Sequence, residues 1–116
     1  MKARIQGIIL TGATLALFAI GPTAAHAVDA AAAEALAKKS DCFRCHAVNR
    51  KKKGPAYKDV AKIYRDDRAA GVAEITIRLT VGMVAKFDDG TEEDHVLVKS
   101  KDSDEINNLI DWILTR

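Results

Sequence analysis

The sequence predicts a small all-α domain, on three observations. Residues 29–40 are rich in alanine, the residue with the highest helix propensity. Residues 102–114 place apolar side chains at the repeat that forms one apolar helix face. Residues 72–81 contain β-branched residues, which favour strands, but their apolar side chains also have helical spacing. We predict a helix there because no nearby segment would supply the rest of a sheet.

The first 27 residues have the three parts of a secretory signal peptide. Lys2 and Arg4 give a positive start, residues 8–20 form an apolar run, and Ala25-His26-Ala27 is a small-residue cleavage motif. The run is short for a bilayer span, so we favour cleavage over a retained anchor. We therefore expect a mature domain of residues 28–116, without a membrane span, in the oxidising periplasm.

The predicted helices have recognisable ends. The first ends in two lysines, whose charges suit a helix C-terminus. A short helix at 58–65 lies between a glycine–proline turn at 54–57 and a polar break at 66–68. Ser103 is placed to cap the closing helix, because two acidic residues follow it in the first turn.

Residues 83–98 are the segment that fits an all-α domain least well. An Asp-Gly pair at 89–90 separates two runs of strand-forming residues, which is a hairpin signal. Because a lone hairpin is marginally stable, an irregular loop is the alternative. The segment is thus expected to be a short hairpin or a loop.

A C-x-x-C-H motif, made by Cys42, Cys45 and His46, lies between the first two predicted helices. This is the attachment motif of a c-type haem. On a helical turn the three side chains share a face, so two thiols can bond the haem vinyl groups while the imidazole binds iron. A thioredoxin-type disulfide would need a preceding strand. A closed zinc site needs four ligands, but the sequence has no second cysteine pair, and of the remaining histidines, His26 and His95, the first lies in the predicted signal peptide. We predict one covalently bound haem c with His46 as its proximal ligand.

A haem would also supply apolar interior that this short chain lacks. A domain of this size buries little surface by itself. Few aromatic residues follow the predicted signal peptide: Phe43, Tyr57, Tyr64, Phe87 and Trp112. We therefore expect the haem-free chain to fold poorly.

Three segments share a pattern known from one family: Cys42-Phe43-Arg44-Cys45-His46-Ala47-Val48, Gly54-Pro55-Ala56-Tyr57-Lys58-Asp59-Val60-Ala61 and Asp111-Trp112-Ile113-Leu114. They resemble the short bacterial class I cytochromes c, the type that donates electrons to periplasmic nitrite reductase and terminal oxidases. The resemblance implies that the N- and C-terminal helices cross, with the haem in a crevice. It also implies that the Pro55 carbonyl accepts a hydrogen bond from His46 and orients its imidazole.

The chain departs from that family on the other side of the iron. The family presents a methionine in a Pro-Met-Pro-Pro loop, sixteen residues before the C-terminal tryptophan. In this chain that position, counted back from Trp112, is Val96, which cannot bind iron, whereas its neighbour His95 can. Met83 has the family's residue type but comes early, and a third option is an open sixth position. We expect His95 as the distal ligand, with Met83 as the alternative.

The predicted function is one-electron transfer between respiratory redox partners, and not enzymatic catalysis. Outside the haem motif, the sequence has no nucleophile–base set. A haem sensor or gas-binding protein, with an open or displaceable sixth position, is the alternative. A subunit dedicated to one dehydrogenase is a third possibility. We expect a monomer that does not bind nucleic acid.

Charge is segregated along the chain, with basic residues dominating 38–68 and acidic residues dominating 88–111. Such a distribution orients a protein during encounters. We expect a basic patch near the haem to steer partners with acidic docking surfaces, although these side chains could also simply solvate a loop. The patch comprises Arg44, Arg50, Lys51, Lys52, Lys53 and Lys58.

Overall fold

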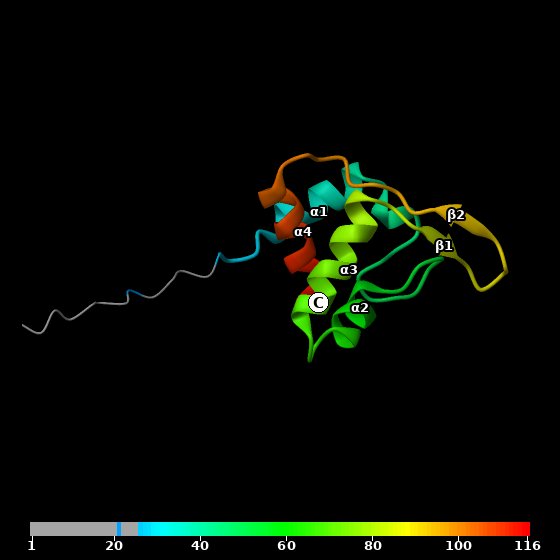
Figure 1. The fold of residues 1–116 in the computed structure, drawn as a ribbon, viewed down its shortest axis with the longest axis horizontal. Helices are drawn as coiled ribbons and strands as arrows, with labels where there is room; N and C mark the ends of the chain where they lie inside the picture. The colour runs from blue at the N-terminus through cyan, green and yellow to red at the C-terminus, as the bar shows by residue number, and fades with distance from the viewer. Residues whose placement is uncertain (1–20, 22–25) are drawn as a thin grey trace, which may run out of the picture.

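The computed structural model describes residue 21 and residues 26–116 of the chain (Figure 1). Most of the predicted signal peptide, residues 1–27, and its apolar run lie outside the described residues. Among the residues that are described, no helix is long and apolar enough to cross a membrane.

Helices dominate the described chain, which confirms the predicted fold class, and two short strands form the hairpin that residues 83–98 suggested. In chain order the elements are α1 (Ala30–Lys39), a 3-10 turn η1 (Cys42–Arg44), α2 (Tyr57–Ile63), α3 (Arg68–Thr80), β1 (Val84–Lys86), β2 (Glu92–Asp94) and α4 (Ser103–Leu114).

Aspartates begin three of the four helices described. The side chain of Asp29 accepts a hydrogen bond from the backbone of α1, and Asp67 does the same for α3. Because Asp67 caps it, α3 starts at Arg68, inside the segment expected to be a polar break. Asp102 caps α4 by accepting from two backbone amides, so the prediction of Ser103 as the cap is wrong by one residue. A carboxylate also suits the positive end of the helix dipole.

The N- and C-terminal helices, α1 and α4, pack against each other to form the centre of the core (Figure 1). Ala33 and Ala37 of α1 are buried, and alanine side chains allow two helices to approach closely. Leu109 and Ile110 of α4 are fully buried in the same cluster. Helices α2 and α3 also pack on α4, so the closing helix contacts all three of the other α-helices. This packing leaves the segment between α1 and α2 at the edge of the core.

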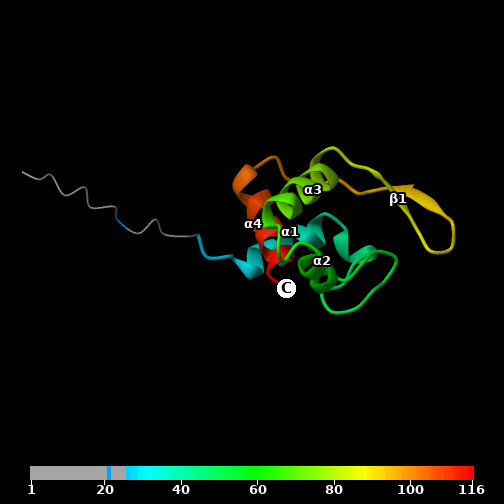
Figure 2. The ribbon, with the colours of Figure 1, turned by 60° about the horizontal axis from the view of Figure 1, so that its bottom comes forward.

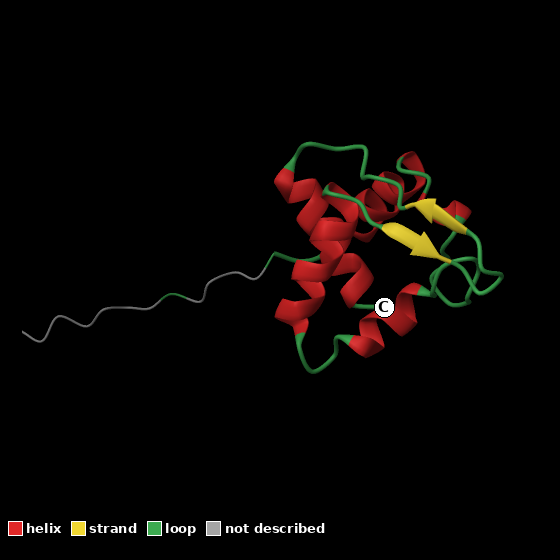
Figure 3. Cartoon of the chain, turned by 45° about the vertical axis from the view of Figure 1, so that its right-hand side comes forward, coloured by secondary structure: helices red, strands yellow, loops and turns green. Residues whose placement is uncertain are grey.

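The hairpin projects away from the helices (Figure 2). Its strands are antiparallel, with Ala85 opposite Glu93, and Figure 3 shows the two arrows running side by side. Gly90 has φ +82°, a left-handed conformation that glycine adopts readily in the connecting turn. Beyond β2 the chain turns back, and a hydrogen bond from Val98 N to Leu79 O ties it to the end of α3. The hairpin is therefore anchored at its base and extended at its tip.

Candidate haem site

The C-x-x-C-H motif folds as one tight turn directly after α1. The backbone N–H of His46 donates to Cys42 O at 3.0 Å, which brings the two ends of the motif together. Cys42 and Cys45 are both free and half-buried. A helix, and not a strand, precedes them, so the arrangement is unlike a thioredoxin-type motif. Asp41 enters the turn with φ 60°, and its carboxylate pairs with Lys99.

A hydrogen bond occupies one ring nitrogen of His46 and leaves the other able to bind a metal. Its Nδ1 lies 2.7 Å from Pro55 O, and because a carbonyl can only accept, Nδ1 carries the proton. This leaves Nε2 as the nitrogen that can bind a metal. Burial lowers the pKa of His46, which favours the neutral imidazole that ligates metals.

Two neighbours hold the His46 ring from its sides. A Cβ added at Gly54 would lie 2.6 Å from His46 Cε1, so a larger residue would collide with the imidazole. Tyr57 stacks on the ring with a centroid distance of 5.2 Å, and its other side meets Trp112 edge-on at 5.7 Å. Tyr57 thereby connects the predicted proximal ligand to the core of α4. Burial raises the pKa of the Tyr57 phenol and of the Cys42 thiol beside it.

His95 faces His46 across the site. The centroids of the two imidazoles are 6.2 Å apart, and the rings are tilted by 55°. His95 Nδ1 lies 3.0 Å from Val96 O, so its Nε2 is also the nitrogen left for a metal. Two metal–nitrogen bonds of ~2 Å, with ~1 Å from each nitrogen to its ring centre, span about 6 Å. The separation therefore fits one iron atom held between the two side chains.

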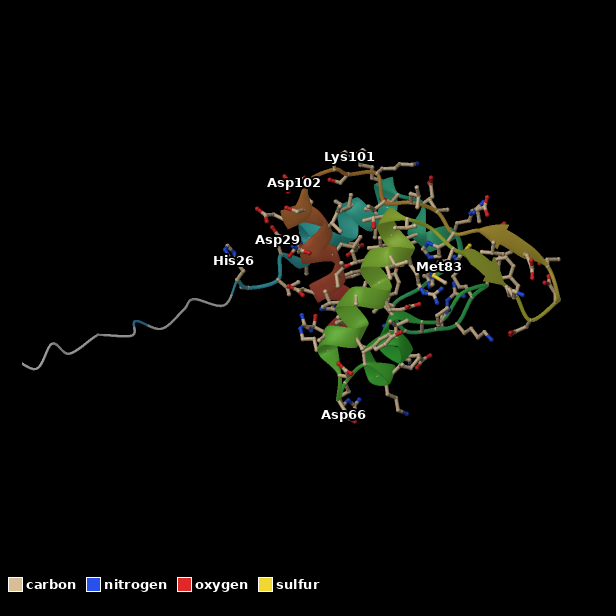
Figure 4. The ribbon with its side chains drawn as sticks, in the orientation of Figure 1. His26, Asp29, Asp66, Met83, Lys101 and Asp102 are labelled. Carbon is tan, nitrogen blue, oxygen red and sulfur yellow. The ribbon has the colours of Figure 1, made fainter. Side chains whose placement is uncertain are left out.

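Met83 lies at the base of the hairpin, where Figure 4 labels it, and does not line the cavity described below. Its side chain is 42% exposed. Its backbone carbonyl instead accepts from His95 N at 2.7 Å, which extends the β1–β2 ladder to the histidine. Met83 thus contributes its backbone to the position of His95.

A cavity of about 490 Å³ lies between the motif, helices α2 and α3, and the hairpin. Its volume is in the range of cofactor pockets. The two imidazoles, the two thiols and Pro55 line it together with apolar side chains, namely Val60, Ile63, Ile75, Leu79 and Val96. Arg78 also lines it and is paired with Glu74 at 2.7 Å. Among the residues described, no three His, Cys, Asp or Glu side chains group to hold a metal ion without a cofactor. The residues present therefore fit an apolar, iron-bearing macrocycle attached through the cysteines.

Much of the expected basic patch turns out to contact the hairpin. Arg44 pairs with Glu93 at 2.9 Å, Lys51 pairs with Asp88, and Lys53 lies over the ring of Phe87. Lys52 donates to the backbone carbonyl of Phe43. These contacts were not predicted from the sequence, although the opposite charges of 44–53 and 88–94 are a signal for them.

Comparison with known proteins places the chain in a family. The sequence model of the Cytochrome c family matches residues 30–116. Cytochrome c-551 of Allochromatium vinosum is 38% identical over 79 residues, covering 68% of this chain and 80% of that protein. Cytochrome c-551 of Pseudomonas aeruginosa is 40% identical over 70 residues, covering 60% of this chain and 66% of that protein.

Solved structures show the same architecture. The class 1 cytochrome MtoD from Sideroxydans lithotrophicus ES-1 superposes with a TM-score of 0.71 at 46% identity, covering 77% of this chain and 97% of that one. Cytochrome c552 of Nitrosomonas europaea gives a TM-score of 0.55 at 29% identity, covering 71% and 96%. The chain therefore belongs to the cytochrome c family, as a small class I electron carrier, not an enzyme, that has one covalently bound haem c.

Proposed function

We propose that this protein moves one electron at a time between periplasmic redox partners, with His46 and His95 as the two axial ligands of its haem iron. The observation that carries the proposal is the pair of opposed imidazoles, 6.2 Å apart, with both Nδ1 atoms tied to backbone carbonyls. Such outer contacts orient a ligating histidine and raise its basicity. Cys42 and Cys45 would hold the haem by thioether bonds.

Two imidazole ligands have a consequence for the reduction potential. Ligation by methionine raises the potential of a haem, as in cytochromes c with a Met/His pair. We therefore expect a lower potential than in relatives with a methionine on the distal side. The function remains electron transfer, but the partners must match that lower potential.

The ligand assignment is tested by optical and magnetic spectra of the haem-loaded wild type, His95→Ala and Met83→Ala. We expect His95→Ala to lose the low-spin spectrum, because iron loses the protein ligand at its sixth coordination position. Met83→Ala serves as the control and should keep it, because Met83 does not line the cavity. A low-spin spectrum unchanged in His95→Ala would contradict the assignment.

A haem sensor, the second candidate, would need a sixth position that small molecules reach freely. The place of His95 opposite His46 supports the carrier instead, because the histidine would occupy that position. Carbon monoxide separates the two: a sensor would bind it readily in the reduced state, whereas a carrier would bind it only after losing His95.

The proposed partners are redox proteins with acidic docking surfaces. Arg50 and Lys58 take part in no ion pair between described residues, so their charges are available near the motif. Such charges steer association and do so less as salt is added.

Export to the periplasm is supported by the signal-peptide pattern of residues 1–27. We expect mass spectrometry of the exported protein to show a mature chain that begins at Val28.

A further inference from the structure

The hairpin is fastened to the haem-attachment loop by side chains that are distant in sequence. Arg44 Nη2 lies 2.9 Å from Glu93 Oε1, so the second variable residue of the motif is paired with strand β2. Lys51 pairs with Asp88 at the turn of the hairpin. Between its ends, the hairpin is therefore tied to the attachment loop by side chains at the molecular surface.

The Arg44–Glu93 pair lies between the attachment point and the predicted distal ligand. Glu93 Oε1 is 3.8 Å from Cys45 Sγ, and Glu93 precedes His95 by two residues. Glu93 lies opposite Ala85 in the ladder, and His95 continues that ladder through its hydrogen bond to Met83. A shift of Glu93 would therefore shift His95.

We propose that Arg44 and Glu93 are positioning residues that form an ionic latch, which holds His95 at the sixth iron position and limits access of small ligands. The proposal rests on the proposed ligation by His95. A two-stranded hairpin is marginal by itself, so its ties decide how often it opens. The latch is exposed, with side-chain exposures of 58% for Arg44 and 35% for Glu93, so dissolved salt weakens it.

Carbon monoxide is a suitable probe of this latch because it carries no charge. His95 must leave before carbon monoxide can bind, so one nitrogen–iron bond breaks, one carbon–iron bond forms, and no electron is transferred. Ionic strength does not alter the approach of a neutral molecule, and any salt effect on the rate must come from the protein.

The experiment measures the rate of carbon monoxide binding to the reduced, haem-loaded protein at low and high ionic strength. For Glu93→Gln at low ionic strength we expect binding about two- to fivefold faster than wild type, which is the loss of one exposed ion pair. The wild type should approach the variant's rate at high ionic strength, whereas the variant should respond less.

Glu92→Gln is the matched control. The same chemical change is made one residue away, but Glu92 pairs with Lys86 inside the hairpin and not with the motif. Its rate should stay at the wild-type value. The double variant Arg44→Glu with Glu93→Arg exchanges the two charges, so the ion pair can form again. It should restore slow binding, whereas binding would stay fast if Glu93→Gln only disturbed the local structure. Amide hydrogen exchange in residues 84–94 should rise in Glu93→Gln and fall again in the exchanged pair.

The outcomes separate the latch from the ligand assignment. Equal rates for Glu93→Gln and Glu92→Gln, while His95→Ala loses its low-spin spectrum, would overturn the latch alone. An unchanged spectrum in His95→Ala would overturn the ligand assignment, and the latch with it. Failure of the exchanged pair to slow binding would show that Glu93 acts through another contact.

Discussion

At the scale of single residues, hydrogen bonds decide which nitrogen of each imidazole can bind a metal. The Nδ1 atoms of His46 and His95 are both committed to carbonyls, so only their Nε2 atoms are free to bind a metal. Gly54 keeps the space beside His46 open, and Tyr57 closes its other side. These short-range contacts thus orient the imidazole rings through the protein alone.

Gly54→Ala should disturb the site more than the fold. The added Cβ would lie 2.6 Å from His46 Cε1, so the imidazole must move. We expect a shifted haem absorption spectrum and potential, with a loss of about 1–3 kcal/mol in the free energy of unfolding, typical of overpacking. Spectroscopy and denaturant unfolding of the haem-loaded protein measure the two effects.

Gly71→Ala is the control for that variant. Its Cβ would meet Tyr64 at 2.8 Å, so it should also destabilise the protein, but neither imidazole is among the nearest atoms that the Cβ would meet. Its haem spectrum should change less than that of Gly54→Ala, because Tyr64 lines the cavity but is not a candidate ligand. A Gly54→Ala spectrum that matches the wild type would mean that the His46 ring is not confined by this glycine.

Residue patterns predicted part of this site and not the rest. The spacing of Cys42, Cys45 and His46 is local, and a single turn brings them together. The position of His95 depends on a register between two strands, which local propensities leave open because the hairpin is short. Counting from Trp112 pointed to His95 only because of a family resemblance.

At the scale of elements, helix ends were harder to predict than helix existence. The apolar and alanine-rich patterns predicted all four α-helices, because helical periodicity extends over many residues. The caps depend on one side chain each, and neighbouring residues compete for the role. In α4 the competitors were Asp102 and Ser103, and the carboxylate makes the contacts.

Asp102→Ala should therefore destabilise the protein, whereas Ser103→Ala should not. Asp102 accepts from Asp104 N and Glu105 N, and losing such a cap costs about 0.5–2 kcal/mol. Ser103 is the first helical residue and is exposed. Denaturant unfolding of both variants gives the comparison. A larger effect for Ser103→Ala would restore the serine as the cap.

At the scale of the whole molecule, the charge separation seen along the chain is partly cancelled by folding. Arg44 and Lys51, from the basic stretch, pair with acidic residues of the hairpin, and Arg68 pairs with Asp111 of α4. These pairs place part of the basic charge directly beside acidic charge. Of the expected basic patch, Arg50 and Lys58 take part in no ion pair between described residues.

Removing the haem should loosen the whole domain. The cavity of about 490 Å³ lies between the motif, α2, α3 and the hairpin, and its apolar lining would face water without the cofactor. We expect the double variant Cys42→Ala with Cys45→Ala, purified without haem, to lose helical signal in circular dichroism and gain amide exchange in α2 and the hairpin. The α1–α4 pair should be the last to lose protection. Equal protection in both forms would show that the cofactor is not part of the core.

The sequence by itself determined the cofactor and the helical class, and it predicts the attachment residues, because each rests on neighbours within a turn or on a long periodic pattern. Only the tertiary structure decided how His95 meets His46, and how Glu93 reaches Arg44, 49 residues away along the chain. These contacts depend on where the hairpin folds back. The Asp-Gly turn signal predicts a hairpin, but it does not specify the cross-strand register or the ion pairs that tie the hairpin to the motif.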